Sequence, residues 1–434
     1  MTEEPTLKRS DIILIFALAL LARVLWALFS GLGPEAGVDF DRWDAFSSAI
    51  LQGRFNLETT VVHDPNLDTR LFIAAPLYPY ALALAKLVFQ GQWFAGLGII
   101  QILISSISVV YLAATARLIF KSRAVALTAG VVYALYLPTL YYAQLPSQES
   151  LFQSFFVISF YGLCRYNTFR DWRSLLFFSL FFTLALLTKS HVILMVPLVC
   201  ALVVFCQPSV TRALAHVAIF LGIIALLTLP YGLYNLRVNG VYVISTSGSG
   251  GHFLTAHNDD FYTWLIRTPP KGTPEFERLA DLRFSAFSKQ GIPNDASHKE
   301  RQSIYLRRGL DWIAANPSKA LKLRVHNLLH YLQPGYSLRF QSFRNWLVAL
   351  VFNVPIYILA YIELIKQLKT PRRHLPAYIV FVTMLLFVLI FYAQNRFRLI
   401  TIEPIYVLYA APGLLTIGSW IRSRLATKSF NLQG

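Results

Sequence analysis

Apolar stretches of about 17 to 25 residues recur along most of this chain, and they constrain its fold more than any other feature. A helix of about 20 such residues crosses a hydrocarbon layer about 30 Å thick. Apolar residue types make up 56% of the chain and charged types only 14%. That leaves too little polar surface to cover one soluble core. The sequence therefore predicts an all-α polytopic membrane protein.

The apolar stretches predict about ten membrane-spanning helices, near residues 12–30, 93–117, 124–144, 149–165, 174–188, 190–206, 213–231, 345–365, 376–394 and 402–420. A further apolar stretch, 76–90, has only fifteen residues, includes two prolines and contains Lys86. As a helix it would be about 22 Å long. We expect it to lie along the membrane interface, and the alternative is an eleventh span.

The distribution of basic residues orients the predicted spans. The chain has a formal net charge of +17, which could indicate nucleic-acid binding but is explained more simply by cytoplasmic loops facing anionic lipid. With ten spans, most cations fall in cytoplasmic connections, and counting 76–90 as a span would move them outside. We therefore expect a protein of the bacterial inner (plasma) membrane with both termini cytoplasmic, membrane lipids as partners and no nucleic-acid partner.

Two long external segments divide the predicted chain. Residues 1–231 form an N-terminal transmembrane module that includes an external loop at 31–92 with juxtamembrane helices. Residues 232–342 form the one long polar stretch, expected to be a small and mostly helical external domain with a helix break at Asn316-Pro317. Residues 343–434 supply the last transmembrane helices and a cytoplasmic tail.

This topology gathers most of the unusual polar residues at the outer ends of the spans. The stretch "GVDFDRWDAF" places Asp39, Asp41 and Asp44 just after the first span. Carboxylates can act as general bases or hold a divalent cation, and the arginine fork binds phosphate oxygens. The other candidates are Glu149, Lys189, His191, His252, His257, Arg396 and Arg398.

Each candidate also has a purely structural explanation. Arg396 and Arg398 could extend to lipid headgroups, and Glu149 could complement a helix dipole. The aspartates could serve only to keep a loop in contact with water, and the histidines could be hydrogen-bonded loop residues.

Several motifs resemble those of the GT-C membrane glycosyltransferases, which include the protein O-mannosyltransferases and the aminoarabinose transferases. "VDFDRWDAFSSAILQGRF" is similar to their first external loop, with Asp39 fourteen residues before Gly53. "AAPLYPYALALAKLVFQG", "YYAQLPSQESLF", "LLTKSHVILMVPL" and "AQNRFRLITIEPIYVLYAAPG" are similar to later family segments in the same order. The sequence departs from the family pattern at Tyr231, at His252 and at Ile400 or Thr401, where tryptophan, asparagine and proline are frequent.

The resemblance implies an inverting glycosyltransferase that uses a polyprenyl-phosphate sugar at the outer face of the membrane. Asp39, with Asp41 as the neighbour that could substitute, would be the catalytic base. The substrate-binding residues would be Glu149, Lys189, His191, His257, Arg396 and Arg398. A divalent metal held by Asp39 and Glu149 is a further expectation, and no other cofactor is implied. The acceptor, a glycan, a lipid or a protein, stays open.

Three other functions are compatible with the same features. Transporters for lipid-linked sugars tend to show internal repeats and charges near mid-membrane, and the sequence shows no repeat. A ligase or polymerase would act on a diphosphate-linked oligosaccharide. A scaffold that keeps the fold without activity would tolerate loss of Asp39.

Overall fold

The computed structural model describes residues 5–37, 40–53, 75–246, 248–267, 273–276, 296–334 and 343–430. Within these ranges the regular structure is entirely helical, without a strand, so the predicted all-α class is confirmed. The principal helices are α1 (Arg9–Phe29), α2 (Phe40–Leu51), α3 (Leu77–Phe89), α4 (Trp93–Phe120), α5 (Arg123–Ala134), α6 (Leu137–Gln144), α7 (Gln148–Phe169), α8 (Trp172–Thr188), α9 (Met195–Cys206), α10 (Val210–Asn239), α11 (Ser249–Ala256), α12 (Asp259–Arg267), α14 (His298–Ala315), α15 (Pro317–Leu332), α16 (Phe343–Lys366), α17 (Pro371–Ile390) and α18 (Asn395–Phe430).

Local side-chain chemistry sets several helix boundaries. The Asp171 side chain accepts a hydrogen bond from the Ser174 amide at 2.9 Å and so caps the start of α8. Ser297 and Glu300 form a reciprocal capping box at the start of α14. The predicted break at Asn316-Pro317 separates α14 from α15, with Pro317 at the first helical position, where its missing N–H costs nothing.

The predicted count of ten spans is not supported by the helix lengths and compositions. Six helices or continuous helical stretches of the described chain are long and apolar enough to cross a membrane, or seven if α5 and α6 form one broken span. The predicted spans 149–165, 174–188 and 190–206 correspond to α7, to α8 and to a short 3-10 turn (Ser190–Leu194) followed by α9. The last two are shorter apolar helices, and α7 carries several glutamines and serines as well as Glu149. The structure therefore supports a polytopic helical membrane protein, with fewer helices of spanning length than predicted.

The predicted interfacial helix, 76–90, is α3, and it continues into α4. The apolar stretch Leu77–Phe120 is 44 residues long, about twice what one span requires. Gln90, between the two helices, has a positive φ of 45°. Whether α3 lies in the interface or in the membrane stays a prediction.

The break between α5 and α6 is a bend of 52°. Buried side chains donate hydrogen bonds to backbone carbonyls at this bend. Arg23 of α1 is fully buried and donates to the carbonyl of Ala134 at 3.3 Å and to the Ser105 hydroxyl at 2.8 Å. The Thr139 hydroxyl donates to the Tyr136 carbonyl at 2.8 Å. In a membrane these bonds matter because a freed carbonyl has no water to bind.

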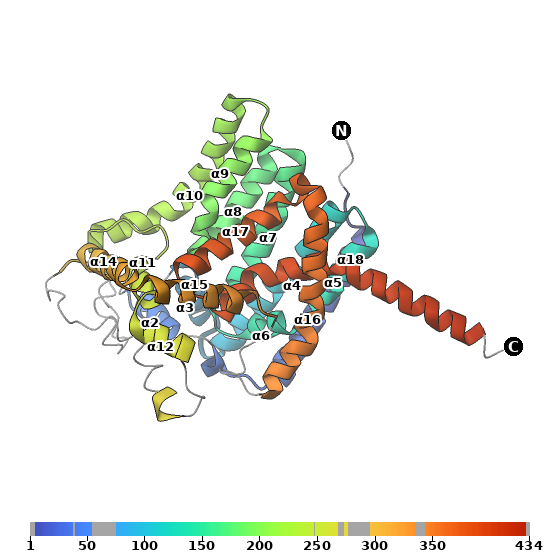
Figure 1. The fold of residues 1–434 in the computed structure, drawn as a ribbon, viewed down its shortest axis with the longest axis horizontal. Coiled ribbons are helices and arrows are strands. Elements are labelled where there is room, and N and C mark those ends of the chain that lie inside the picture. Colours follow the sequence, from blue (N-terminus) through green and yellow to red (C-terminus); the bar gives the residue numbers. More distant parts are fainter. Residues whose placement is uncertain are drawn as a thin grey trace.

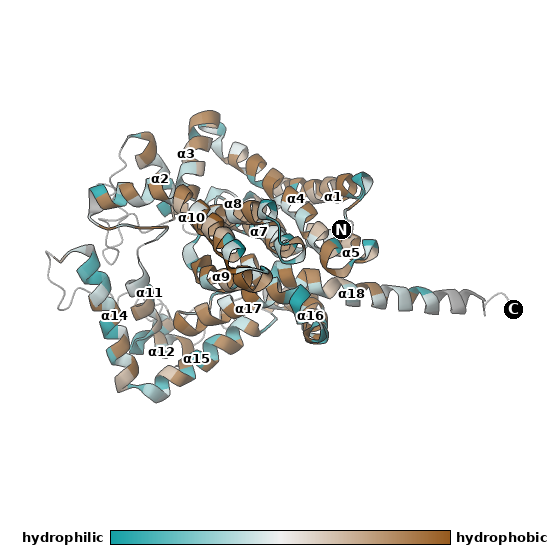
Figure 2. Ribbon diagram, turned by 90° about the horizontal axis from the view of Figure 1, so that it is seen from above, coloured by the Kyte–Doolittle hydropathy of each residue, from teal (hydrophilic) through white to brown (hydrophobic). Residues whose placement is uncertain are grey.

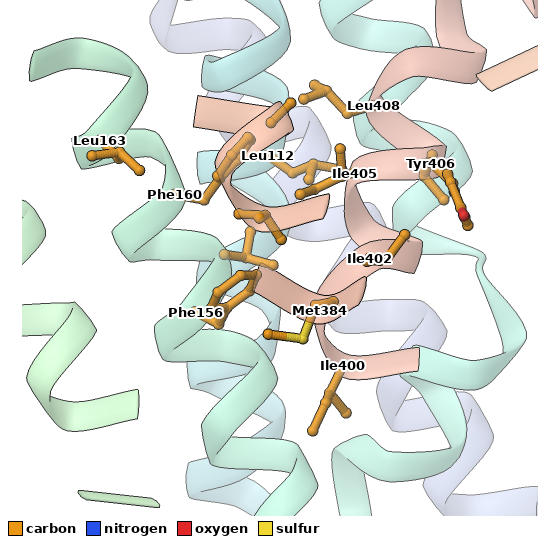
Figure 3. Packing of buried hydrophobic residues seen from close by; sticks show 14 of the residues in the cluster. Leu112, Phe156, Phe160, Leu163, Met384, Ile400, Ile402, Ile405, Tyr406 and Leu408 are labelled. Atoms are coloured by element: carbon orange, nitrogen blue, oxygen red, sulfur yellow. The ribbon is translucent and has the colours of Figure 1, made fainter. Parts of the chain in front are cut away.

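Helix α7 lies at the centre of the bundle and packs against α4, α8, α17 and α18 (Figure 1). Figure 3 shows Phe156 and Phe160 of α7 facing Met384 of α17 and Ile402 of α18. The first half of α18 is buried all round, whereas its C-terminal part extends away from the bundle (Figure 1). This packing brings the N-terminal ends of α7 and α18 together.

The helices between the spans gather at the opposite end of the molecule from the C-terminus (Figure 2). Helix α2 packs on α3, and α11 packs on α14. At Gly250 of α11, an added Cβ would lie 2.2 Å from the Gln302 carbonyl oxygen of α14. Only glycine allows these two helices to approach so closely.

Candidate functional site

The buried carboxylate of Glu149 is the centre of the candidate site. Lys189 Nζ lies 2.5 Å from Glu149 Oε1, and Arg396 Nη1 lies 3.7 Å from the same oxygen. The Ser147 hydroxyl donates to the other carboxylate oxygen. Glu149 is fully buried, Lys189 is nearly so, and Arg396 is partly exposed. The structure thus brings together three predicted substrate-binding residues.

Three helix ends position these side chains. Glu149 lies in the first turn of α7, whose N-cap is Ser147. Lys189 directly follows the last residue of α8, and Arg396 lies in the first turn of α18. The Gln153 side chain, one turn into α7, donates to the Leu399 carbonyl at 3.0 Å and so ties α7 to α18.

An aromatic surface lies beneath the charged groups. The Phe397 ring lies 4.8 Å from Lys189 Nζ and 5.7 Å from the Arg396 guanidinium carbon, distances at which cation–π attraction acts. The ring of His191 lies against Phe397 at 5.4 Å and against Phe152 at 4.8 Å. Both His191 nitrogens are buried and lack a hydrogen-bond partner among the described residues. A buried polar ring of this kind is available to a ligand.

The segment between α1 and α4 approaches the same place. Trp43 of α2 packs edge-on against Tyr78 of α3 at 5.7 Å, and Tyr78 lies close enough to Glu149 for the carboxylate charge to act on it. The Tyr78 hydroxyl is buried and has no described partner. At Gly37, an added Cβ would lie 2.7 Å from the Pro146 carbonyl oxygen. The backbone just before Asp39 therefore touches the loop that leads to Glu149.

The aspartates of this segment have different surroundings. Asp39, the predicted base, lies outside the described residues. Asp41 is exposed in the first turn of α2. Asp44 pairs with Lys86 of α3 at 2.7 Å, which gives it a structural role in holding α2 on α3.

The surroundings of Glu149 do not fit the predicted divalent metal. A metal-binding carboxylate offers free oxygen lone pairs, whereas the Glu149 oxygens already face Ser147, Lys189 and Arg396. In the described part of the chain, no group of three or more histidine, cysteine or acidic side chains could hold a metal ion.

Arg398, a predicted substrate-binding residue, has buried partners within the protein. Its Nε donates to Glu403 Oε1 at 3.1 Å, and its Nη1 donates to the Gln333 carbonyl at 2.6 Å, at the end of α15. Tyr136 and Tyr357 donate to Glu403 at 2.6 and 2.5 Å. Arg398 and Glu403 are both fully buried. Arg398 therefore stabilises the packing of α15, α16 and α18, with Glu403 as its carboxylate partner.

His257 is also absent from the Glu149 cluster. It is buried against Phe253 and Trp312, and its Nδ1 lies 2.8 Å from the Phe253 carbonyl. Burial, with a smaller contribution from the charge of Arg324, lowers the pKa of His257 to about 4. His257 is thus a neutral packing residue at the end of α11.

His252 is linked to the cluster through Tyr392. It contacts the Tyr392 hydroxyl at 3.1 Å, and the Tyr392 ring lies 6.3 Å from the Phe397 ring. The Arg42 and Arg396 charges are near enough to act on the His252 ring.

The sequence did not single out Ser147, Tyr78 and Phe397 of the site, nor Glu403, the buried partner of Arg398. A usable signal existed for two of them. Ser147 precedes a glutamate at a helix start, the pattern of a capping residue. Glu403 is a lone acid in a long apolar stretch, where an ionisable residue needs a buried partner. Tyr78 and Phe397 gave no signal, because aromatic residues are abundant throughout the chain.

The chain is similar to a known protein family and to a solved structure. Residues 74–231 match the model of the family described as dolichyl-phosphate-mannose-protein mannosyltransferase. The fold is similar to that of the archaeal oligosaccharyltransferase AglB from Archaeoglobus fulgidus, solved with an inhibitory peptide and a dolichol-phosphate, with 13% identity and a TM-score of 0.53. The match covers 97% of this chain and 51% of AglB, so the chain spans about half the length of that enzyme. No curated protein shows a significant sequence match.

Proposed function

We propose that this chain is a membrane glycosyltransferase of the GT-C superfamily and that it transfers a sugar from a polyprenyl-phosphate donor to an acceptor at the outer face of the membrane. The observation that carries the proposal is the convergence of Lys189 and Arg396 on Glu149 in a buried setting. Lysine and arginine are the side chains that bind phosphate oxygens. The outer face is part of the proposal and rests on the expected placement of cations in cytoplasmic connections.

The proposed reaction is a single displacement with inversion. The acceptor hydroxyl or amine loses its proton to a carboxylate, for which we propose Asp39, and its lone pair attacks the anomeric carbon. The bond between that carbon and the phosphate oxygen breaks, and the polyprenyl phosphate leaves with its negative charge. Lys189 and Arg396 would stabilise that charge, and a preorganised cation in a water-poor site does so strongly. Glu149 would hold both cations in place.

Two unpartnered polar groups support a ligand at this place. The Tyr78 hydroxyl and the His191 nitrogens are buried without a described hydrogen-bond partner. An unsatisfied buried polar group costs about 1–3 kcal/mol. A phosphate or sugar hydroxyl between these groups would recover that cost, and we assign His191 and Tyr78 to donor binding on this ground.

The test uses purified protein in lipid nanodiscs with synthetic polyprenyl-phosphate sugars and a panel of acceptors. We expect release of polyprenyl phosphate by the wild type, and strong loss of release for Asp39→Asn and Arg396→Ala with unchanged membrane insertion. Asp41→Asn tests the exposed neighbour that could substitute as the base; loss of release in Asp41→Asn, with release retained in Asp39→Asn, would assign the base to Asp41. Full activity of Asp39→Asn would contradict the assigned base.

A second donor series separates the proposed transferase from the other lipid-linked glycan enzymes. Oligosaccharide ligases and polymerases use diphosphate-linked donors, so activity with these donors alone would replace the proposal. Binding of either donor without turnover, combined with transport across the bilayer, would indicate a transporter.

A further inference from the structure

Helix α15 (Pro317–Leu332) carries an apolar stripe that no described part of the protein covers. Leu321, Val325 and Leu329 are spaced four residues apart and are 66%, 49% and 63% exposed. The opposite face of the helix, which includes Leu323 and Tyr331, is buried against the protein. Aligned exposed apolar side chains over two turns are unusual on a water-facing helix.

The end of α15 reaches residues inside the membrane-spanning bundle. The Tyr361 hydroxyl of α16 donates to the Leu332 carbonyl, the last of α15, at 3.0 Å. Tyr361 lies well inside the candidate span Ala349–Lys369 and also contacts the Tyr406 hydroxyl of α18 at 2.7 Å. In Figure 2, α15 runs from its corner with α14 back towards α16 and α17. Its C-terminal end is therefore at membrane depth.

The middle of α15 is fixed to the end of another span. Arg324 donates to the carbonyls of Leu389 and Phe391, at 2.9 and 2.6 Å, where α17 ends. A cation at a helix C-terminus is favourable because the last carbonyls carry partial negative charge. Leu386 and Leu389 of α17 are themselves exposed, so the stripe of α15 adjoins the apolar surface of a span.

The charge of α15 fits a lipid surface. Its sequence, PSKALKLRVHNLLHYL, contains lysine, arginine and histidine but no acidic residue. Lys322 is exposed next to the stripe. A basic helix with one apolar face is the pattern of helices that lie in a membrane interface, where cations reach phosphate headgroups.

We propose that α15 is embedded in the edge of the bilayer, with Leu321, Val325 and Leu329 against lipid acyl chains. The segment 232–342 is then not wholly an aqueous domain, because its last helix belongs to the membrane part of the protein. This surface does not depend on the chemistry at Glu149, and its partner is the bilayer itself.

Fluorescence quenching in nanodiscs tests the depth of the stripe. A small thiol-reactive fluorophore is attached to Leu321→Cys, Val325→Cys or Leu329→Cys, in a background with Cys164, Cys200 and Cys206 replaced by alanine. The aqueous control is Asp311→Cys on α14, and the lipid control is Leu386→Cys on α17; both positions are exposed. Lipids with a nitroxide on the acyl chain report contact with hydrocarbon, and iodide reports contact with water.

We expect the stripe labels to lose fluorescence to nitroxide lipid as the Leu386 label does, and to be protected from iodide relative to the Asp311 label. Quenching of the stripe by iodide as strong as at Asp311 would overturn the proposal and would indicate a surface for a protein or peptide. If the alanine background unfolds, the buried Cys164 and Cys206 are kept, and the signal of the labelled parent is subtracted.

Discussion

Lys189 Nζ lies 2.5 Å from Glu149 Oε1, although 40 positions separate the two residues in the chain. Both side chains are buried at the meeting point of α7, α8 and α18. Removing one partner of a buried ion pair leaves an uncompensated charge, which is more costly than removing both. The pair therefore couples the stability of the bundle to the candidate site.

A double-mutant cycle measures this coupling. Glu149→Gln and Lys189→Met should each lower the free energy of unfolding by about 3 kcal/mol, because each removes the nearest opposite charge from a buried group. The double variant should lose less than the sum of the two. Chemical unfolding in detergent gives the three values, and strictly additive losses would show that the two side chains do not interact.

Variants of the two arginines in "NRFRLI" should affect different properties of the protein, one its activity and the other its stability. Arg396→Ala should change stability little, because the side chain is partly exposed, but should strongly reduce donor turnover. Arg398→Ala should lower the free energy of unfolding by about 3–5 kcal/mol, because it strands the buried Glu403. Thermal melting and donor release, measured on both variants, check this; equal melting temperatures for the two would contradict it.

The pKa of His257 predicts a loss of stability in acid. This pKa is about 4 in the folded protein and about 6.5 in the unfolded chain. Between these values the unfolded chain binds a proton that the folded protein does not, so the free energy of unfolding falls as the pH falls. The full loss is about 3 kcal/mol, complete below pH 4 and absent above pH 6.5.

The variant His257→Gln isolates this contribution. It should flatten the fall in melting temperature between pH 6.5 and 4 relative to the wild type. An identical fall in both proteins would mean that other groups cause the acid sensitivity.

Two glycines should respond oppositely to alanine. At Gly162 of α7, an added Cβ would lie 2.9 Å from the backbone of Phe178 of α8, so Gly162→Ala should cost about 1–3 kcal/mol through overpacking. At Gly222 of α10, no atom lies within 4 Å of the added Cβ, and alanine is the better helix former. Gly222→Ala should therefore melt at the wild-type temperature or above it. A comparable loss in both variants would contradict the close approach of α7 to α8.

Much of the helical architecture could be predicted because its signals are local. The apolar stretches that correspond to α1, α10, α16 and α17 have the length of a span, and the Asn316-Pro317 break is a property of proline. The count of spans was less predictable. The predicted spans included α7, α8 and α9 because all three lie in an apolar part of the sequence. In the structure α8 and α9 are shorter than a span, and α7 contains too many polar residues to pass as one.

The sequence by itself determined that the protein is a helical membrane protein with acids and cations near the ends of its helices, because helix periodicity, caps and apolar length are set within a few turns. The tertiary structure decided which of those groups meet. Arg396 and Arg398 are two residues apart, and on a helix that separation turns side chains about 200° away from each other. One therefore reaches Glu149 and the other Glu403, a difference that depends on how α7, α16 and α18 pack.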